Sequence, residues 1–279
     1  MTQREFPLDL RQSAGSGPEP LDDGALILRG HASSHAADMI AQIRRMARQS
    51  PFRRMTTPGG GSMSVAMTCC GLRGWCSDAY GYRYEVRDPL TGQPWPAMPE
   101  GWRQMAVAAA AMAGYKGFAP DSCLINGYRV GARMGLHQDR DERADAPVVS
   151  LSFGLPAIFL WGGLLRTDPL RRIPLLHGDV VVWGGTTRLA FHGIAPLRKG
   201  DHPLTGPCRY NLTFRRTAER GWWSVAHYGP PSVVDQAVRA AASRARWVMA
   251  ATSGVPAGTS HAPPTHRTEG RPSHSEAVS

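Results

Sequence analysis

The sequence has few of the features that mark a secreted, disulfide-stabilised or membrane-inserted protein. Its five cysteines are odd in number and include no CxxC pair, whereas secreted disulfide frameworks are even and dense. The opening MTQREFPLDL contains no apolar run of the kind that a signal peptide needs. The most apolar stretch, residues 148–165, is interrupted by glycine, proline and serine, so it predicts buried strands rather than a membrane helix. We therefore expect reduced thiols and a cytoplasmic location.

Acidic residues are scarce relative to basic ones. The 32 lysines and arginines outnumber the 22 aspartates and glutamates, which gives a formal charge of +10. A basic protein suits a polyanionic partner, because phosphate contacts dominate affinity for nucleic acid. Charge describes association rather than fold, however, and many basic proteins bind nothing anionic. Nucleic acid is therefore a candidate partner that the charge alone does not establish.

Short strands dominate the sequence after residue 120, and two helices are expected before them. Apolar residues recur at helical spacing from Ala36 to Met46, and a second helix is predicted from Pro99 to Gly114. Strands are predicted at residues 25–28, 63–68, 123–128, 148–153, 157–161, 179–183, 189–192 and 209–214. The pattern predicts a mainly β fold of the α+β class, a barrel or jelly roll with helices bracing one side.

The composition also divides the chain. Residues 1–20 are rich in Gly, Ser and Pro and predict a flexible arm, and residues 21–216 predict the folded domain. Residues 217–279 form an extension, with one helix expected over 233–251 and a Pro/Ser/Thr/His-rich end that predicts disorder.

A possible metal site begins with the tripeptide His137-Gln138-Asp139. In an extended chain, residues two apart point to the same face, so one imidazole and one carboxylate can reach one ion. The best third ligand is His192, beside a predicted strand end. Two histidines and one carboxylate leave positions open on the ion, as non-haem iron(II) oxygenases require. The alternative is an exposed histidine beside a solvated acid cluster, Asp139, Asp141 and Glu142.

A candidate anion site lies in the segment RYNLTFR, residues 209–215. Read as a strand, it has Arg209, Asn211, Thr213 and Arg215 on one face and Tyr210, Leu212 and Phe214 on the other. Two arginines inside a barrel are costly unless a multivalent anion lies there. A dicarboxylate fits, because guanidinium binds carboxylate in bidentate fashion. An amphipathic strand with solvent-facing arginines remains the alternative.

These residues lie in a series of segments that resembles the AlkB family of DNA and RNA repair dioxygenases. The segments span roughly residues 51–215 and read SPFRRMTTPGG, SMSVAMT, PWPAMP, DSCLINGY, LHQDRDE, LSFGLPAIF, HGDVVVWGG and RYNLTFR. The resemblance implies a double-stranded β-helix with a nucleotide-recognition lid at about residues 51–90. It implies Fe(II) bound by His137, Asp139 and His192, with O2 and 2-oxoglutarate as cosubstrates. The implied 2-oxoglutarate contacts are Asn126, Gly127, Tyr128, Arg209, Tyr210, Asn211, Thr213 and Arg215, and which arginine takes which carboxylate stays open.

The same resemblance implies a substrate and a reaction. The substrate is an N-alkylated base such as 1-methyladenine or 3-methylcytosine, in DNA or as a further candidate in RNA, single-stranded or flipped from a duplex. Hydroxylation of the alkyl carbon releases an aldehyde and restores the base. The implied substrate contacts are Trp75, Tyr82, Arg83, Tyr84, Asp141 and Arg166, and Asp141 is also implied in catalysis because it reads the base edge.

The sequence departs from the family pattern at Gly61, where an aromatic is expected, and at Gly127, where a larger residue is expected. The first departure bears on substrate range. Two other functions stay open: a related oxygenase acting on a protein or small molecule, and a non-catalytic nucleic-acid-binding homologue. We expect a monomer by default.

Overall fold

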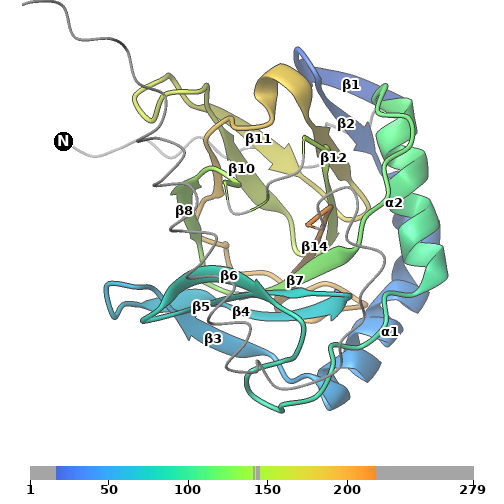
Figure 1. Cartoon of the computed structure of the whole chain (residues 1–279). Coiled ribbons are helices and arrows are strands. Elements are labelled where there is room, and N and C mark those ends of the chain that lie inside the picture. The colour runs from blue at the N-terminus through green and yellow to red at the C-terminus, as the bar shows by residue number, and fades with distance from the viewer. Residues whose placement is uncertain (1–16, 141, 143–144, 218–279) are drawn as a thin grey trace, which may run out of the picture. The chain divides into compact units, whose positions relative to one another are not determined.

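The computed structural model describes residues 17–140, 142 and 145–217, and this part of the chain folds as a jelly roll (Figure 1). Its larger sheet has eight strands, in spatial order β1 (Gly17–Asp22), β2 (Ala25–Arg29), β12 (Val180–Trp183), β9 (Val148–Gly154), β14 (Cys208–Arg215), β7 (Ser122–Arg129), β4 (Ser62–Gly71) and β3 (Arg53–Thr56). The smaller sheet has four strands, in the order β11 (Arg171–Leu175), β10 (Ala157–Trp161), β13 (His192–Ile194) and β8 (Met134–His137). Neighbouring strands pair antiparallel in both sheets. The predicted mainly β fold is therefore confirmed.

Strand alternation sorts the apolar side chains into two cores. On β12, Val181 and Trp183 pack into the inner core between the sheets, while Val180 and Val182 pack into an outer core. Such all-apolar strands are expected where both faces of a sheet are covered. The inner core surrounds the space in which polar side chains from β7 and β14 gather.

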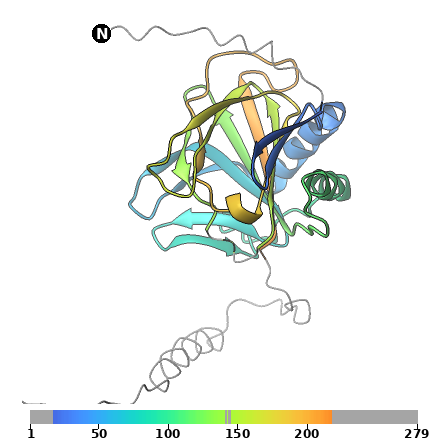
Figure 2. The same ribbon diagram turned by 90° about the horizontal axis from the view of Figure 1, so that it is seen from above.

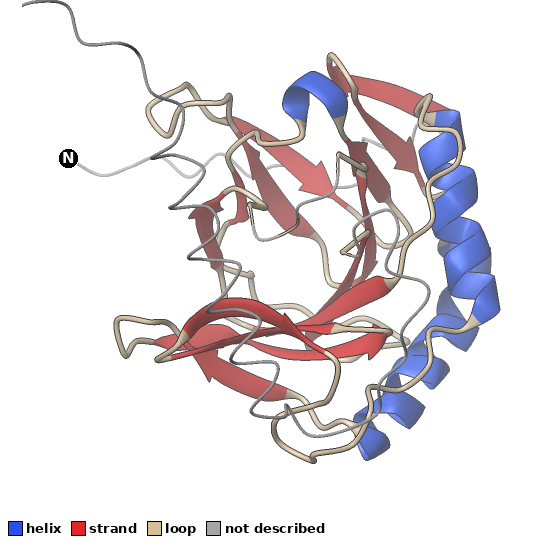
Figure 3. Ribbon diagram, viewed as in Figure 1, coloured by secondary structure: helices blue, strands red, loops and turns tan. Residues whose placement is uncertain are grey.

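Two helices cover the outer face of the larger sheet (Figure 3). The short 3-10 turn η1 (Ser33–His35) leads into α1 (Ala36–Gln49), which buries Met39, Ile40 and Ile43 in the outer core. Helix α2 (Glu100–Met112) adds Trp102 and a row of alanines that allows close approach. Both helices agree with the prediction of bracing on one side. Among the described residues, no helix is both long and apolar enough to cross a bilayer.

The hairpin of β5 (Gly74–Asp78) and β6 (Gly81–Glu85) forms a separate two-stranded sheet (Figure 2, cyan). Strand β5 contacts β3, β4 and β7, so the hairpin lies against one end of the larger sheet. A Cβ at Gly74 would lie 2.2 Å from the Trp95 ring, so only glycine allows this packing. The Trp95 indole also donates to the Glu85 carbonyl at 2.9 Å and fixes the end of β6. Within the predicted lid, β3 and β4 thus extend the larger sheet and only β5–β6 stands apart.

Two boundaries differ from the sequence predictions. Strand β1 begins at Gly17, inside the segment 1–20 that was predicted as a flexible arm, because Gly17–Asp22 pairs with β2. The strand predicted at 189–192 instead occupies His192–Ile194, and the residues before it include a 3-10 turn, η2 (Gly185–Thr187). Residues 1–16, Asp141 and the predicted helix at 233–251 lie outside the described residues.

Candidate metal centre and cosubstrate cavity

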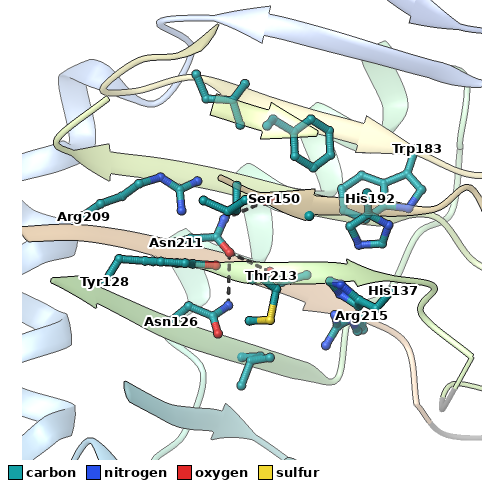
Figure 4. Close-up of a pocket in the computed structure, with 16 residues that line it drawn as sticks. Asn126, Tyr128, His137, Ser150, Trp183, His192, Arg209, Asn211, Thr213 and Arg215 are labelled. Carbon is teal, nitrogen blue, oxygen red and sulfur yellow. Dashed lines mark hydrogen bonds between the residues drawn. The ribbon is translucent and has the colours of Figure 1, made fainter. Parts of the chain in front are cut away.

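A cavity of about 480 Å³, its open mouth included, lies between the inner faces of the two sheets. Figure 4 shows Arg209 at one end of the cavity, and Arg215 with His137 and His192 at the other. Strands β7, β9 and β14 of the larger sheet supply most of the polar lining, whereas Trp183 of β12 and Phe159 and Leu175 of the smaller sheet supply an apolar wall.

The predicted metal ligands come together at one end of this cavity, where His137 and His192 line it and Asp139 lies beside them. His137 ends β8 and faces His192 of β13 as its direct cross-strand partner, and Asp139 follows two residues after His137. The two Nε2 atoms lie 3.6 Å (His137) and 3.9 Å (His192) from Asp139 Oδ1. One ligand atom from each residue falls within 4.8 Å of the others. This spacing allows all three side chains to bind one ion.

Hydrogen bonds orient both imidazoles for metal binding. The Nδ1 atom of His137 lies 2.9 Å from the Gly135 carbonyl oxygen, and that of His192 lies 2.9 Å from the Ala190 carbonyl oxygen. A carbonyl only accepts, so each Nδ1 carries the proton and each Nε2 keeps its lone pair. Burial, together with the neighbouring His137, lowers the pKa of His192 to about 4. At neutral pH His192 is therefore the neutral ligand that a metal requires.

The carboxylate of Asp139 is ionised and fixed in place. Burial would raise its pKa, but Arg215 and the neighbouring histidines outweigh burial and hold the pKa below the usual value. Arg215 Nη2 donates to both oxygens of Asp139, at 2.9 and 3.0 Å. Asp139 is 6% exposed, so the alternative of a solvated surface acid is wrong. Hard anionic oxygen beside two imidazoles suits iron(II).

The other end of the cavity is prepared for an anion. Arg209 is 1% exposed, and its Nη2 donates to Ser152 Oγ at 3.0 Å. Its Nε and Nη1 have no hydrogen-bond partner among the described residues, and burial lowers its pKa. A buried guanidinium with unpaired donors is costly unless a ligand completes it. The dicarboxylate 2-oxoglutarate therefore fits the side chains that line the cavity.

Between the two ends, amides and hydroxyls form a connected floor. Asn126 donates to the side-chain oxygen of Asn211 at 3.1 Å, and Asn211 donates to Ser150 at 2.7 Å. Thr213 donates to the same Asn211 oxygen at 3.1 Å. Tyr128 lines the cavity beside Arg209, whose guanidinium carbon lies 5.0 Å from the ring centroid. Asn126, Tyr128, Asn211 and Thr213 were predicted as 2-oxoglutarate contacts and all line the cavity, and their contact with the cosubstrate stays a prediction.

Two predicted cosubstrate contacts, Gly127 and Tyr210, do not line the cavity. They are direct partners in the β7–β14 register and occupy the opposite face, as strand alternation requires. Phe52 packs on this face, 5.9 Å from the Tyr210 ring, and a Cβ at Gly127 would lie 3.3 Å from the Phe52 ring. The space left by the small residue at 127 is thus filled by Phe52.

The predicted substrate residues on the hairpin have distinct surroundings. Trp75 is half-buried against the inner core and stacks on Tyr82, with ring centroids 5.6 Å apart and planes at 16°. Arg83 is held by ion pairs to Asp78 and Glu85 and does not line the cavity.

The Tyr84 hydroxyl contacts charged groups of the protein, and its predicted contact with the substrate backbone stays a prediction. The hydroxyl donates to buried Glu142 and lies 3.5 Å from Arg215 Nη1. Burial raises the Tyr84 pKa well above its ordinary value, so the hydroxyl keeps its proton and acts as the donor.

Arg166 lies on the turn beside the metal ligands, with its Nη1 donating to the Leu136 carbonyl at 2.9 Å. Its guanidinium carbon lies 5.8 Å from the Phe191 ring centroid. Leu136 precedes His137 and Phe191 precedes His192, so Arg166 is at the edge of the metal centre. Asp141, the predicted base-reading carboxylate, lies outside the described residues.

Sequence reasoning missed two charged residues near the metal centre. Glu142, which the alternative interpretation treated as solvated, is 8% exposed and pairs with Arg188 and Arg215. Arg188 is the second, and it pairs with Glu142 and donates to the Asp139 carbonyl. The available signal was position, because Glu142 follows Asp139 by three residues and Arg188 precedes His192 by four.

Two histidines and a carboxylate that leave metal positions open, beside a buried arginine that can take a carboxylate, define a 2-oxoglutarate-dependent iron(II) oxygenase. The family model of the 2OG-Fe(II) oxygenase superfamily matches residues 24–215. The alpha-ketoglutarate-dependent dioxygenase AlkB of Escherichia coli K12 is 56% identical over 214 residues, covering 76% of this chain and 99% of that protein. The chain belongs to the AlkB family of these dioxygenases, with Fe(II) as its metal and 2-oxoglutarate and O2 as its cosubstrates.

More distant relatives are members of the same family by name. The DNA N(6)-methyladenine demethylase ALKBH1C of Arabidopsis thaliana is 31% identical over 222 residues, covering 69% of this chain and 48% of that protein. The solved structure of OsALKBH1 superposes with a TM-score of 0.65 at 29% identity and covers 71% of this chain and 99% of that one.

Proposed function

We propose that this protein removes N-alkyl groups oxidatively from nucleic-acid bases such as 1-methyladenine and 3-methylcytosine. The proposal rests on the His137–Asp139–His192 cluster, whose two histidines line one end of the cavity, and on Arg209 with unpaired donors at the other end. The match to AlkB extends across this whole region, and the plant relative is named as a demethylase of DNA. DNA is the proposed substrate, with RNA as a second nucleic acid to test.

His137, Asp139 and His192 are the proposed iron ligands, and Arg209 and Arg215 the proposed carboxylate partners. Arg215 lies beside Asp139, so it is suited to the 2-oxoglutarate carboxylate nearer the metal. Arg209 at the opposite end is suited to the far carboxylate. Asn126, Tyr128, Asn211 and Thr213 line the path between them and orient the chain of the cosubstrate.

When bound, iron(II) with 2-oxoglutarate and O2 supplies the oxidising power that hydroxylates the N-alkyl carbon, after which the base nitrogen is released with loss of an aldehyde. The protein holds the reactants in place and limits access of water. The apolar wall of Phe159, Leu175 and Trp183 keeps the cavity interior dry on the side away from the polar floor. Arg215 keeps the Asp139 carboxylate ionised for the metal.

The hairpin β5–β6 is the proposed base-recognition element. Trp75 and Tyr82 already stack on each other, and a flipped base offers a further π-face to the same aromatic pair. A cationic alkylated base is attracted to these ring faces. We propose three secondary contacts to the substrate: Arg166, Asp141 and Arg83. Arg166 lies at the edge of the metal centre, and the other two lie close in sequence to other site residues. The formal charge of +10 supports a phosphate-bearing partner.

We also propose that the protein acts as a cytoplasmic monomer on single-stranded or base-flipped substrate. The five cysteines are all free, as expected in a reducing compartment. Sedimentation equilibrium would test the monomer, and comparison of single-stranded with duplex oligonucleotides would test the strand preference.

The proposed function is tested by measuring which substrate stimulates succinate formation. Protein loaded anaerobically with Fe(II) and 2-oxoglutarate is exposed to air with a 1-methyladenine oligonucleotide, a methyl-lysine peptide, or the unmethylated oligonucleotide as control. Stimulation by the methylated oligonucleotide alone is expected. Stimulation by the peptide would favour a protein oxygenase, and no stimulation by any substrate would favour a non-catalytic binding protein.

A further inference from the structure

A buried network of charged side chains lies directly behind the iron-ligand segment. Arg188, whose side chain is 11% exposed, donates from Nη1 to the Asp139 carbonyl and from Nε to the Ala146 carbonyl, both at 2.9 Å. Its Nη2 lies 3.3 Å from Glu142 Oε2. One guanidinium therefore holds the chain at Asp139, at Glu142 and at Ala146.

The second oxygen of Glu142 faces the opposite direction, toward the hairpin. Glu142 Oε1 accepts the hydroxyl proton of Tyr84, which belongs to β6 and is 58 residues away in the sequence. Arg215 Nε lies 3.2 Å from the same oxygen. The Glu142 carboxylate thus joins the hairpin, the metal-ligand segment and β14.

Burying these charged side chains costs free energy, so packing alone does not explain them. Burying an ion pair is often no more stabilising than packing apolar side chains of similar volume. Groups behind a metal ligand, by contrast, orient it, and their loss weakens metal binding. Here Arg188 binds the backbone of Asp139 itself, so its effect on the orientation of that ligand is direct.

We propose that Tyr84, Glu142 and Arg188 form a latch, which fixes the backbone at the metal ligand Asp139 to the β6 strand of the hairpin. The three are positioning residues for the iron site, a role that rests on the metal ligands assigned under the proposed function. Because one network holds both elements, metal binding and ordering of the hairpin favour each other, and the coupling is reciprocal. The base-recognition element is therefore most ordered when the metal is bound.

The first test measures metal binding by itself, with Co(II) as the probe and its absorbance as the readout. Arg188→Met and Glu142→Gln are expected to weaken Co(II) binding roughly tenfold, the lower end of what loss of such partners costs. Arg44→Met is the matched control, because Arg44 is an exposed helix arginine whose Nη2 donates to a loop carbonyl, Leu204, at 2.8 Å. It should bind Co(II) like wild type. The double variant should lose less than the sum of the single losses, because the two residues share one ion pair.

The second test separates coupling from simple structural support. Hydrogen exchange of the β6 amides is measured with and without Co(II) in wild type and in Tyr84→Phe, which keeps the ring and loses the hydroxyl. Wild type should exchange more slowly with Co(II), and Tyr84→Phe should show little difference. The latch alone would be overturned if Co(II) slowed exchange of the β6 amides equally in wild type and Tyr84→Phe. It would also be overturned if Arg188→Met and Glu142→Gln bound Co(II) as tightly as wild type. Wild type that binds no Co(II) would overturn the metal site and the latch together.

Discussion

The two arginines on the inward face of β14 are both buried, yet their surroundings are opposite. Arg215 is surrounded by acids, with Asp139 at 2.9 Å and Glu142 at 3.2 Å, and these raise its pKa although burial alone would lower it. Arg209 has a hydroxyl partner and a tyrosine ring, and two of its nitrogens lack a partner among the described residues. Arg215 thus already has acidic partners within the protein. The charge of Arg209 has no acidic partner among the described residues.

The largest expected effect comes from breaking the metal end. His192→Ala removes one of three ligands, so turnover should fall by more than the roughly 10–100-fold that loss of an outer partner costs. The measurement is succinate formation alongside Co(II) binding. His202→Ala is the control, since His202 stacks on His177 and does not line the cavity. Residual turnover within tenfold of wild type in His192→Ala would contradict the ligand assignment.

Replacing Arg209, at the end of the cavity away from the metal, should lower the affinity for 2-oxoglutarate and leave metal affinity unchanged. Arg209→Met removes the proposed carboxylate partner, and losing one side of a buried charge pair costs about 3 kcal/mol, or roughly a hundredfold in affinity for 2-oxoglutarate. Co(II) affinity measured without cosubstrate should stay unchanged. An unaltered KM for 2-oxoglutarate would show that Arg209 does not bind it.

The comparison is sharpest in the stability of the cosubstrate-free protein. Arg215→Met removes the arginine partner of buried Asp139, while Arg188 still pairs with Glu142, so the free energy of unfolding should fall by about 3–5 kcal/mol. Arg209→Met removes a buried charge that has no acidic partner among the described residues, so it should not destabilise the protein. Urea unfolding of both variants without metal gives the two values. A similar loss in both would contradict the asymmetry.

The smallest effect concerns a second pair of histidines. His177 and His202 have ring centroids 4.4 Å apart, the same spacing as His137 and His192, but they lie outside the cavity. Burial, followed by the neighbouring His202, lowers the His177 pKa below its ordinary value of 6.5. The pKa of His177 is therefore lower in the folded protein than in the unfolded chain. At a pH between the two values, His177 is protonated only in the unfolded chain, so the free energy of unfolding falls as pH falls below about 6.5.

Replacing His177 should remove that part of the pH dependence. In the wild type the Gly154 amide donates a hydrogen bond to His177 Nδ1 at 3.0 Å, and His177→Asn keeps an acceptor for it. Urea unfolding at a series of pH values from 7.5 to 5 (approximately) should show a smaller slope in the variant than in wild type. Identical slopes would mean that His177 titrates alike in both states.

Most strands of the central part of the larger sheet and the metal-ligand cluster could be predicted because their signals are local, whereas β1, β3, β5, β6 and β11 were not among the predicted strands. Period-two alternation in residues 209–215 identified the polar face of β14, and the HxD spacing identified two ligands of one ion. Strand β11 was missed because it contains Pro174, which is tolerated here only because β11 is an edge strand. Strand β13 begins later than predicted, where Gly193 allows the β8 backbone to approach closely, its Cβ position lying 2.7 Å from the Met134 carbonyl.

The errors in the site have a non-local origin. Glu142 lies in an acid-rich segment and looks solvated, and only the fold buries it against Tyr84 and Arg188. Tyr210 and Gly127 were included with their neighbours, although the alternation of β7 and β14 turns both away from the cavity. Local pattern therefore predicted which strands carry the chemistry, and tertiary packing decided which of their neighbours take part.

The central claim is most directly tested by the mass of a 1-methyladenine oligonucleotide after incubation with the iron-loaded protein, 2-oxoglutarate and air. Wild type should remove one methyl group and release formaldehyde in equal amount, and His192→Ala should remove none. An oligonucleotide of unchanged mass, under conditions in which wild type binds metal and turns over 2-oxoglutarate, would contradict the assignment of alkylated nucleic acid as the substrate.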